Sequence, residues 1–150
     1  RERFPAPPLP PPGAYGQRRR VEWRDIDPAQ HVNNSVYLAY SEDCAVEAST
    51  ALGWAPTRMR EEGFSIEMAR CRIEYRSPAI LADELVVTTW LSDVGEGRAV
   101  RHFAIERDAA VLSRARAEVR CVDCATNAPR PFPDAYLNTL SPSIATGEKR

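Results

Sequence analysis

The amino-acid sequence predicts an α+β fold with five strands and one long helix, an element pattern that more than one α+β fold shares. Alternating apolar and polar residues mark one strand before, and four strands after, a single long segment with helical spacing. Short turns join the last three strand segments, which is typical of an antiparallel meander. The order of one strand, one helix and four strands is that of an α+β domain, and a chain of 150 residues suits one domain.

The chain is expected to begin with an extended arm. Residues 1–17 include the run Pro-Ala-Pro-Pro-Leu-Pro-Pro-Pro, which favours polyproline II and cannot join a sheet ladder. Residues 18–24 alternate Val21 and Trp23 with charged residues and are predicted to form the first strand. We expect the folded domain to span residues 18–135, and residues 136–150 to be a C-terminal tail.

The long helix is predicted over residues 35–52. We expect Ser35 to cap its start and Gly53 to end it in a left-handed conformation. Its many alanines would let a curved sheet wrap closely around it, and residues 57–62 are predicted to add one helical turn. Apolar and small residues recur three and four positions apart, at Tyr37, Tyr40, Cys44, Ala45, Ala48, Ala51 and Leu52.

Four strands are predicted after the helix. They occupy residues 69–76, 84–92, 98–107 and 111–123, where apolar, β-branched and aromatic residues are frequent. Residues 93–97 and 108–110 are predicted to be the turns of the meander.

Composition excludes several classes of function. The formal net charge of −1 lacks the basic excess of a nucleic-acid-binding protein, so we expect no nucleic-acid partner. No run approaches the ~18 apolar residues of a membrane span, and we expect a cytoplasmic protein without a membrane partner. Cys121 and Cys124 form a C-x-x-C, but on a strand such positions face opposite sides. We therefore expect buried, reduced cysteines and no metal.

One loop concentrates polar side chains between the first strand and the helix. Residues 23–34 read Trp-Arg-Asp-Ile-Asp-Pro-Ala-Gln-His-Val-Asn-Asn, with one of only two histidines in the chain. Turn and cap formation would explain Asp27-Pro28 or Asn34-Ser35. It explains less well why His31 and a doubled asparagine share the segment, so we interpret the loop as a candidate functional site.

The segment Asp25-Ile-Asp27-Pro-Ala-Gln-His31-Val-Asn-Asn34, with Tyr37 and Tyr40 after it, resembles the signature of the hotdog-fold thioesterases. That signature reads D-x-D-x-x-x-x-V and precedes a Y-x-x-Y-like helix. The chain is similar to both the 4-hydroxybenzoyl-CoA thioesterase group and the acyl-ACP thioesterases, whose version reads D-x-D-x-N-Q-H-V-N-N. Ile73-Glu-Tyr-Arg-Ser-Pro78 and Ala82-Asp-Glu-Leu-Val86 match the following strand, turn and strand of those families.

The resemblance implies a hotdog fold, in which an antiparallel five-stranded sheet wraps around a long central helix. It also implies a thioesterase that hydrolyses acyl-CoA to a free acid and CoA, as in fatty acid metabolism. It implies Asp27 as nucleophile or general base, with His31 and Asn34 as further catalytic residues. Asn33 and Tyr37 would contact the substrate, and amides at the positive helix N-terminus would stabilise the oxyanion. The family also implies a homodimer or homotetramer. Thioester hydrolysis needs no metal or other cofactor.

Two departures weaken the match to the acyl-ACP enzymes. Ala29 stands where those enzymes have an asparagine, and Pro78 and Ala79 stand where a glutamate or cysteine is expected. These departures favour acyl-CoA as substrate. The alternatives are an acyl-ACP thioesterase, a hotdog dehydratase or hydratase, which Val-Asn-Asn fits poorly, and a catalytically silent acyl-CoA-binding domain.

Other charged residues are expected to be structural. Asp25 would cap the turn, and His102 lies in a strand pattern between Val100 and Ala104. Five arginines on the predicted strands could meet the phosphates of coenzyme A, but such residues are usually solvated: Arg98, Arg101, Arg114, Arg116 and Arg120.

Overall fold

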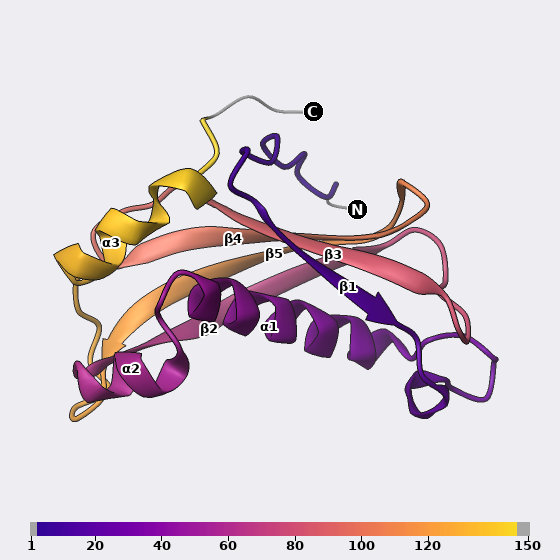
Figure 1. Cartoon of the computed structure of the whole chain (residues 1–150), viewed down its shortest axis with the longest axis horizontal. Helices are drawn as coiled ribbons and strands as arrows, with labels where there is room; N and C mark the ends of the chain where they lie inside the picture. The colour runs from indigo at the N-terminus through magenta and orange to yellow at the C-terminus, as the bar shows by residue number, and fades with distance from the viewer. Residues whose placement is uncertain (1–2, 147–150) are drawn as a thin grey trace.

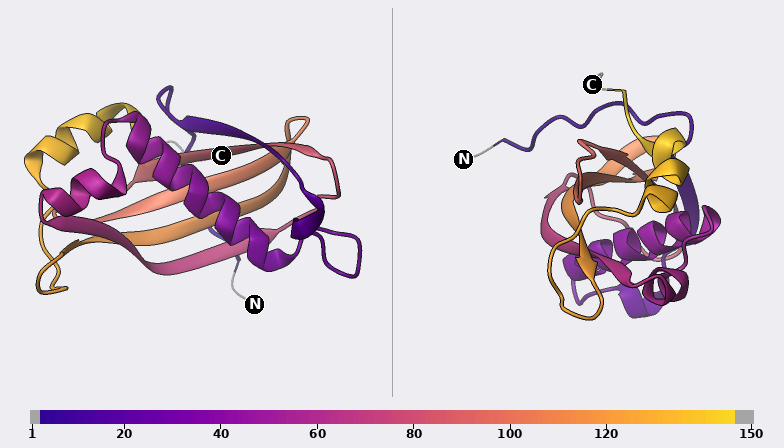
Figure 2. Two further views of the ribbon diagram at one scale, coloured as in Figure 1. Left: turned by 60° about the horizontal axis from the view of Figure 1, so that its bottom comes forward. Right: turned by 90° about the vertical axis from the view of Figure 1, so that its left-hand side faces the viewer.

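The computed structural model describes residues 3–146, which form one antiparallel sheet in the order β1-β3-β4-β5-β2. Helix α1 (Asn34–Ala51) lies along one face of this curved sheet (Figures 1 and 2). This arrangement confirms the predicted α+β fold with five antiparallel strands around a long helix. The strands in chain order are β1 (Tyr15–Arg20), β2 (Phe64–Tyr75), β3 (Glu84–Ser92), β4 (Arg98–Arg107) and β5 (Ala110–Asp123).

The first strand begins and ends earlier than predicted. Strand β1 pairs with β3 from Tyr15 to Arg20, and a short 3-10 helix, η1 (Trp23–Asp25), follows. Val21 is buried, whereas Trp23 is 80% exposed, so the two residues do not share a strand face. The predicted strand over residues 18–24 is therefore correct for residues 18–20 and wrong for residues 21–24, because the Val21 and Trp23 alternation spans a turn.

Helix α1 is positioned by a cap that differs from the expected one. The side chain of Asn33, not Ser35, accepts a hydrogen bond from the Ser35 N–H, and Asn33 is the N-cap. Gly53 follows the helix with φ +89°, which confirms the predicted left-handed end. The predicted further turn is present as α2 (Pro56–Glu61).

Strand β2 begins at Phe64, before the start of the predicted segment 69–76, and ends at Tyr75. Its register with β5 shifts between Met68 and Arg70, close to the predicted start. This irregularity interrupts the alternation that marks a strand in sequence. By contrast, β3 and β4 have the predicted bounds, and β5 begins one residue early.

The apolar face of the sheet packs on α1 in two clusters. One lies towards the helix start and includes Tyr37, Tyr40 and Cys44 with Leu85 and Val87. The other lies towards the helix end and includes these buried residues: Trp54, Phe64, Ala99, Phe103, Ala115, Ala117, Val119 and Tyr136. Small residues on β4 and β5 let the helix and the aromatic rings approach the sheet.

The N-terminal arm lies against the opposite side of the sheet. A Cβ atom at Gly13 would lie 2.2 Å from the Pro142 carbonyl oxygen, so the arm and the C-terminal segment pass closely. Ile144 forms an isolated bridge with Leu91 of β3, and Phe4 lies under the Arg114 guanidinium, 5.3 Å from ring centroid to Cζ.

Helix α3 (Asp134–Leu140) was not predicted, and the expected boundary at residue 135 falls inside it. Its Tyr136 and Leu140 are buried in the second cluster. The ends of the predicted arm and tail, residues 1–2 and 147–150, lie outside the described residues. No helix within residues 3–146 is long and apolar enough to cross a membrane.

The cysteines of the C-x-x-C point to different environments. Cys121 is buried in β5, while Cys124 follows the strand and is exposed. The expectation that the cysteines are buried is therefore wrong for Cys124. All four cysteines are free thiols.

Candidate active site

Asp25 anchors the loop that joins β1 to α1. Its Oδ2 accepts hydrogen bonds from the Tyr40 hydroxyl, at 2.7 Å, and from the Glu22 N–H, at 3.1 Å. Its backbone oxygen accepts the Asn33 N–H at 2.9 Å. Burial, and then the bond to Asp25, raise the pKa of Tyr40, so the phenol remains a donor. The structural role predicted for Asp25 is confirmed.

The loop holds the Asp27 carboxyl in a defined orientation. Its Oδ1 accepts the Ala29 N–H at 2.9 Å and the His31 N–H at 3.4 Å, while the Asp27 N–H donates to the His31 carbonyl at 2.8 Å. The second carboxyl oxygen, Oδ2, has no hydrogen-bond partner within residues 3–146. One oxygen is thus fixed by backbone amides, and the other is free to act on a ligand.

The first turn of α1 leaves one amide free beside this carboxyl. The Asn33 side chain takes the Ser35 N–H at 3.1 Å, and the Asn33 carbonyl takes the Val36 N–H at 2.9 Å. The Asn34 N–H has no acceptor among the residues that the structure describes. Its position at the positive end of an 18-residue helix suits a developing negative charge.

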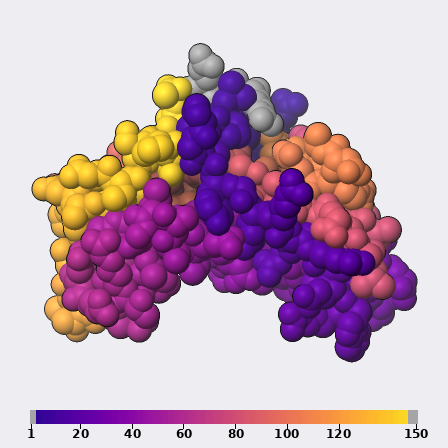
Figure 3. Space-filling model, in the orientation of Figure 1, coloured from indigo at the N-terminus to yellow at the C-terminus, as the bar shows by residue number. Residues whose placement is uncertain are grey.

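A cleft of about 410 Å³ lies at this end of the helix. It brings together four of the five predicted site residues, namely Asp27, His31, Asn34 and Tyr37. Asn33 does not line it, because its side chain folds back to cap the helix. Figure 3 shows the loop and α2 standing out at the two ends of a hollow beneath α1.

The opposite wall of the cleft comes from the end of β2 and the following turn. It is formed by Tyr75, Arg76, Ser77 and Pro78, which sequence reasoning did not assign to the site. The Tyr75 hydroxyl donates to the Asn34 carbonyl at 3.0 Å and so ties the two walls together. The matching Ile73–Pro78 stretch was the available signal, but it did not show which side chains face the loop.

Tyr37 is more buried than a substrate contact usually is. It is 2% exposed, its hydroxyl accepts the Ala79 N–H at 3.0 Å, and its ring lies edge-on to Tyr75 at 5.4 Å. Burial raises the pKa of Tyr37, so the hydroxyl stays protonated. It therefore supports the floor of the cleft and presents little surface to it.

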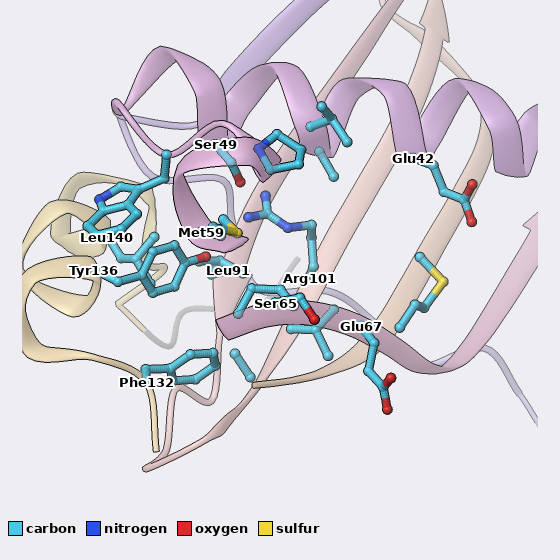
Figure 4. A pocket seen from close by; sticks show the side chains of 18 of the residues that line it. Glu42, Ser49, Met59, Ser65, Glu67, Leu91, Arg101, Phe132, Tyr136 and Leu140 are labelled. Carbon is cyan, nitrogen blue, oxygen red and sulfur yellow. The ribbon is translucent and has the colours of Figure 1, made fainter. Parts of the chain in front are cut away.

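A second cavity, of about 340 Å³, lies under the other half of α1 and contains Arg101 (Figure 4). Arg101 is 8% exposed, so it does not lie on a solvated strand face as the sequence suggested. Its Nη1 donates to Thr89 Oγ1 at 3.1 Å. We call this cavity the Arg101 chamber. Its apolar walls include Trp54, Met59, Leu91, Phe103, Phe132 and Leu140.

His102 has the structural role that the strand pattern predicted. Its Nε2 lies 2.7 Å from Ser92 Oγ, and its ring stacks on Trp90 with centroids 5.5 Å apart. Burial lowers the pKa of His102 to about 4, so the ring is neutral near pH 7. Within residues 3–146, no group of three or more His, Cys, Asp or Glu residues is arranged to hold a metal ion.

The model of the thioesterase-like superfamily matches residues 21–140, which include the loop, α1 and the whole meander. The chain belongs to the thioesterase-like superfamily. Within it, the chain is 28% identical over 112 residues to the long-chain acyl-CoA thioesterase FadM of Escherichia coli (strain K12), covering 71% of this chain and 82% of that protein.

Other members of the superfamily support the same placement. The chain is 29% identical over 115 residues to the acyl-CoA thioesterase YbgC of Haemophilus influenzae, covering 76% of this chain and 85% of that protein. A 1,4-dihydroxy-2-naphthoyl-CoA thioesterase from Synechocystis superposes with a TM-score of 0.78 at 17% identity, covering 85% and 96% of the two chains. This last likeness shows the shared hotdog fold.

Proposed function

We propose that this protein hydrolyses acyl-CoA thioesters and that Asp27 is its catalytic carboxylate. The observation that carries the proposal is the cleft in which Asp27, His31 and the start of α1 meet. The acyl-CoA thioesterases FadM and YbgC, which match most of the chain, support the choice of substrate.

Asp27 can act in either of two ways. As a nucleophile, its free Oδ2 attacks the thioester carbon and the C–S bond breaks, with CoA leaving as the thiolate, which takes a proton from solvent. Water then hydrolyses the resulting mixed anhydride to the free acid and the Asp27 carboxylate. As a general base, it takes a proton from the water that attacks the same carbon, and CoA leaves as the thiol. The backbone bonds to Oδ1 position the carboxyl for both routes, and a positioned base contributes roughly 10²–10⁴-fold in rate.

The Asn34 N–H is the proposed oxyanion donor. It is the amide of the first helical turn that the cap leaves free, and one well-placed donor stabilises the transition state by ~3 kcal/mol. His31 is exposed at the rim of the same cleft and is proposed to contact the substrate or the attacking water. Asn33 acts on this site through its cap of α1.

We propose a homodimer in which β2 pairs with its copy. Strand β2 is an edge strand of 12 residues that pairs only with β5 within residues 3–146, so its other edge carries unpaired backbone groups. Antiparallel pairing of two copies would bring the Tyr75 end of one strand beside the Phe64 end of the other. The cleft of one subunit would then be closed by its partner.

The test is the Asp27→Asn variant, assayed for thiol release across a panel of aliphatic and aromatic acyl-CoA substrates and acyl-ACP. We expect kcat to fall by roughly 10²–10⁴-fold while acyl-CoA still binds. The matched control is Asp108→Asn, because Asp108 is exposed in the β4–β5 turn with φ +51°, which asparagine tolerates. Undiminished hydrolysis by Asp27→Asn would refute the assignment of Asp27 as the catalytic carboxylate. Wild-type activity on acyl-ACP but on no acyl-CoA would identify acyl-ACP as the substrate.

A further inference from the structure

Arg101 is a buried cation without a carboxylate partner. It lies on the face of β4 that packs on α1, between the buried residues Ala99 and Phe103. Within residues 3–146, it forms no ion pair, and the polar groups that interact with it are the Thr89 and Tyr136 hydroxyls and the Cys44 thiol. A guanidinium has five N–H donors, so these neutral groups leave part of its hydrogen-bonding capacity unused.

Such an arrangement destabilises a protein unless something compensates for it. Moving a charge out of water is costly, and neutral hydroxyls return only part of that cost. The strand position itself does not require a charge, because the positions two residues away on the same face hold alanine and phenylalanine. The uncompensated charge therefore suggests that the missing partner is an anion that enters the chamber.

The chamber around Arg101 has the form of a ligand pocket. Its volume of about 340 Å³ falls within the ~300–1,000 Å³ range of small-molecule sites, with apolar walls and a few convergent polar groups. In Figure 4 the Arg101 guanidinium points into the cavity towards Ser49, and the Tyr136 hydroxyl faces the same region. That hydroxyl interacts with both Arg101 and Ser49.

We propose that the Arg101 chamber binds an acyl group that carries a carboxylate at its far end, so that the preferred substrates are CoA monothioesters of dicarboxylic acids. The apolar walls would enclose the methylene chain. Arg101 would then form a charge-assisted, bidentate bond to the terminal carboxylate, with Tyr136 as an added donor. This inference rests on the proposed thioesterase function.

The carboxylates near the chamber lie away from Arg101. Figure 4 places Glu42 and Glu67 on the side opposite Ser49 and Tyr136. Glu67 is already paired with Arg120 of β5, and Glu42 is exposed on α1. An incoming anion would therefore be repelled near the Glu42 side and held at the inner, positive end.

The proposed dimer explains how one acyl group could reach both sites. Within one chain, the chamber is lined by residues 65–68 near the start of β2, and the Asp27 cleft by residues 75–78, at the end of β2 and in the turn that follows. Antiparallel pairing of two β2 edges would set the cleft of one subunit beside the chamber of its partner. The thioester would lie at Asp27 while the acyl chain extends into the partner's chamber.

The experiment compares CoA thioesters of equal chain length: adipoyl with hexanoyl, suberoyl with octanoyl and sebacoyl with decanoyl. We expect at least one carboxyl-terminated substrate to have a kcat/KM at least ~10-fold above its partner, because a buried polar site discriminates against a ligand that leaves it unpaired. Arg101→Met should remove this preference but still hydrolyse octanoyl-CoA. Arg98→Met, at an exposed position of the same strand, should keep it.

A second measurement does not depend on hydrolysis or on the folding of a variant. Suberate should bind wild-type protein in calorimetry, whereas octanoate should bind more weakly. Hydrolysis of the plain acyl-CoAs without any preference for a terminal carboxylate would overturn the inference and leave the proposed function intact. If suberate binds and Arg101→Met abolishes this binding, but no thioester is hydrolysed, the result would support anion binding in the Arg101 chamber and refute the proposed thioesterase function. A preference that Arg101→Met retains would also overturn the inference.

Discussion

Replacement of Tyr40 by phenylalanine should loosen the loop that holds Asp27. The Tyr40 hydroxyl donates to Asp25 Oδ2 at 2.7 Å, and the tyrosine is 3% exposed. A hydrogen bond to a charged group contributes ~1.5–3 kcal/mol to stability. The Tyr40→Phe variant should lose this amount, with a fall in Tm of about 3–12 °C for a domain of this size. The ring and its contact with Arg19, 4.5 Å from centroid to Cζ, should remain.

The assay is urea unfolding of wild type, Tyr40→Phe, Asp25→Ala and the double variant. Because the two side chains share one bond, the double variant should lose less free energy of unfolding than the two single variants lose together. The kcat of Tyr40→Phe should also fall, since Asp25 and Asp27 belong to the same loop. Strict additivity of the two losses, or a loss below ~0.5 kcal/mol in Tyr40→Phe, would show that the bond does not anchor the loop.

Two further outcomes follow from other parts of the molecule. His102 has a pKa of about 4 in the folded protein, below its unfolded value of 6.5. Its contribution to stability should therefore be complete above pH 6.5 and lost as the pH falls towards 4. Urea unfolding at a series of pH values should show this loss, and the loss should be smaller in His102→Gln. Gly13→Ala should lower Tm and expose the arm to proteolysis because its Cβ would lie 2.2 Å from the Pro142 oxygen, whereas Gly16→Ala, with no atom within 4 Å, should change neither.

The parts of the fold that sequence predicted are those with strong local signals. Strands β3 and β4 have the predicted bounds because turns with glycine or aspartate end their apolar runs. Helix α3 has only seven residues, too few for its apolar spacing to stand out after the prolines that precede it. Strand β1 was misplaced because pairing with β3, and not local alternation, decides where it lies.

The candidate site likewise contains some residues that a local sequence motif indicates and others that only the tertiary structure brings to the cleft. Asp27, His31, Asn34 and Tyr37 lie within one short segment, so one motif could indicate them together. The second wall of the cleft comes from residues 75–78, and only tertiary structure places it there. Arg101 could not be assigned, because Ala99 and Phe103 on one face of β4 and Val100 and His102 on the other are all buried. Alternation identifies a buried face only where the other face is polar.

Helix α1 relates the two proposed charge sites to each other. Asp27 and the Asn34 amide, the proposed oxyanion donor, lie at its N-terminus, where the helix dipole is positive and favours negative charge. Arg101 faces Ser49, in the last turn, where the dipole is negative and favours a cation. The helix dipole thus stabilises a negative charge at the start of α1 and the Arg101 cation at its end, each by ~0.3–1 kcal/mol. A dipole of that size offsets little of the cost of burying Arg101, so a bound anion remains the stronger reason for a guanidinium at this position.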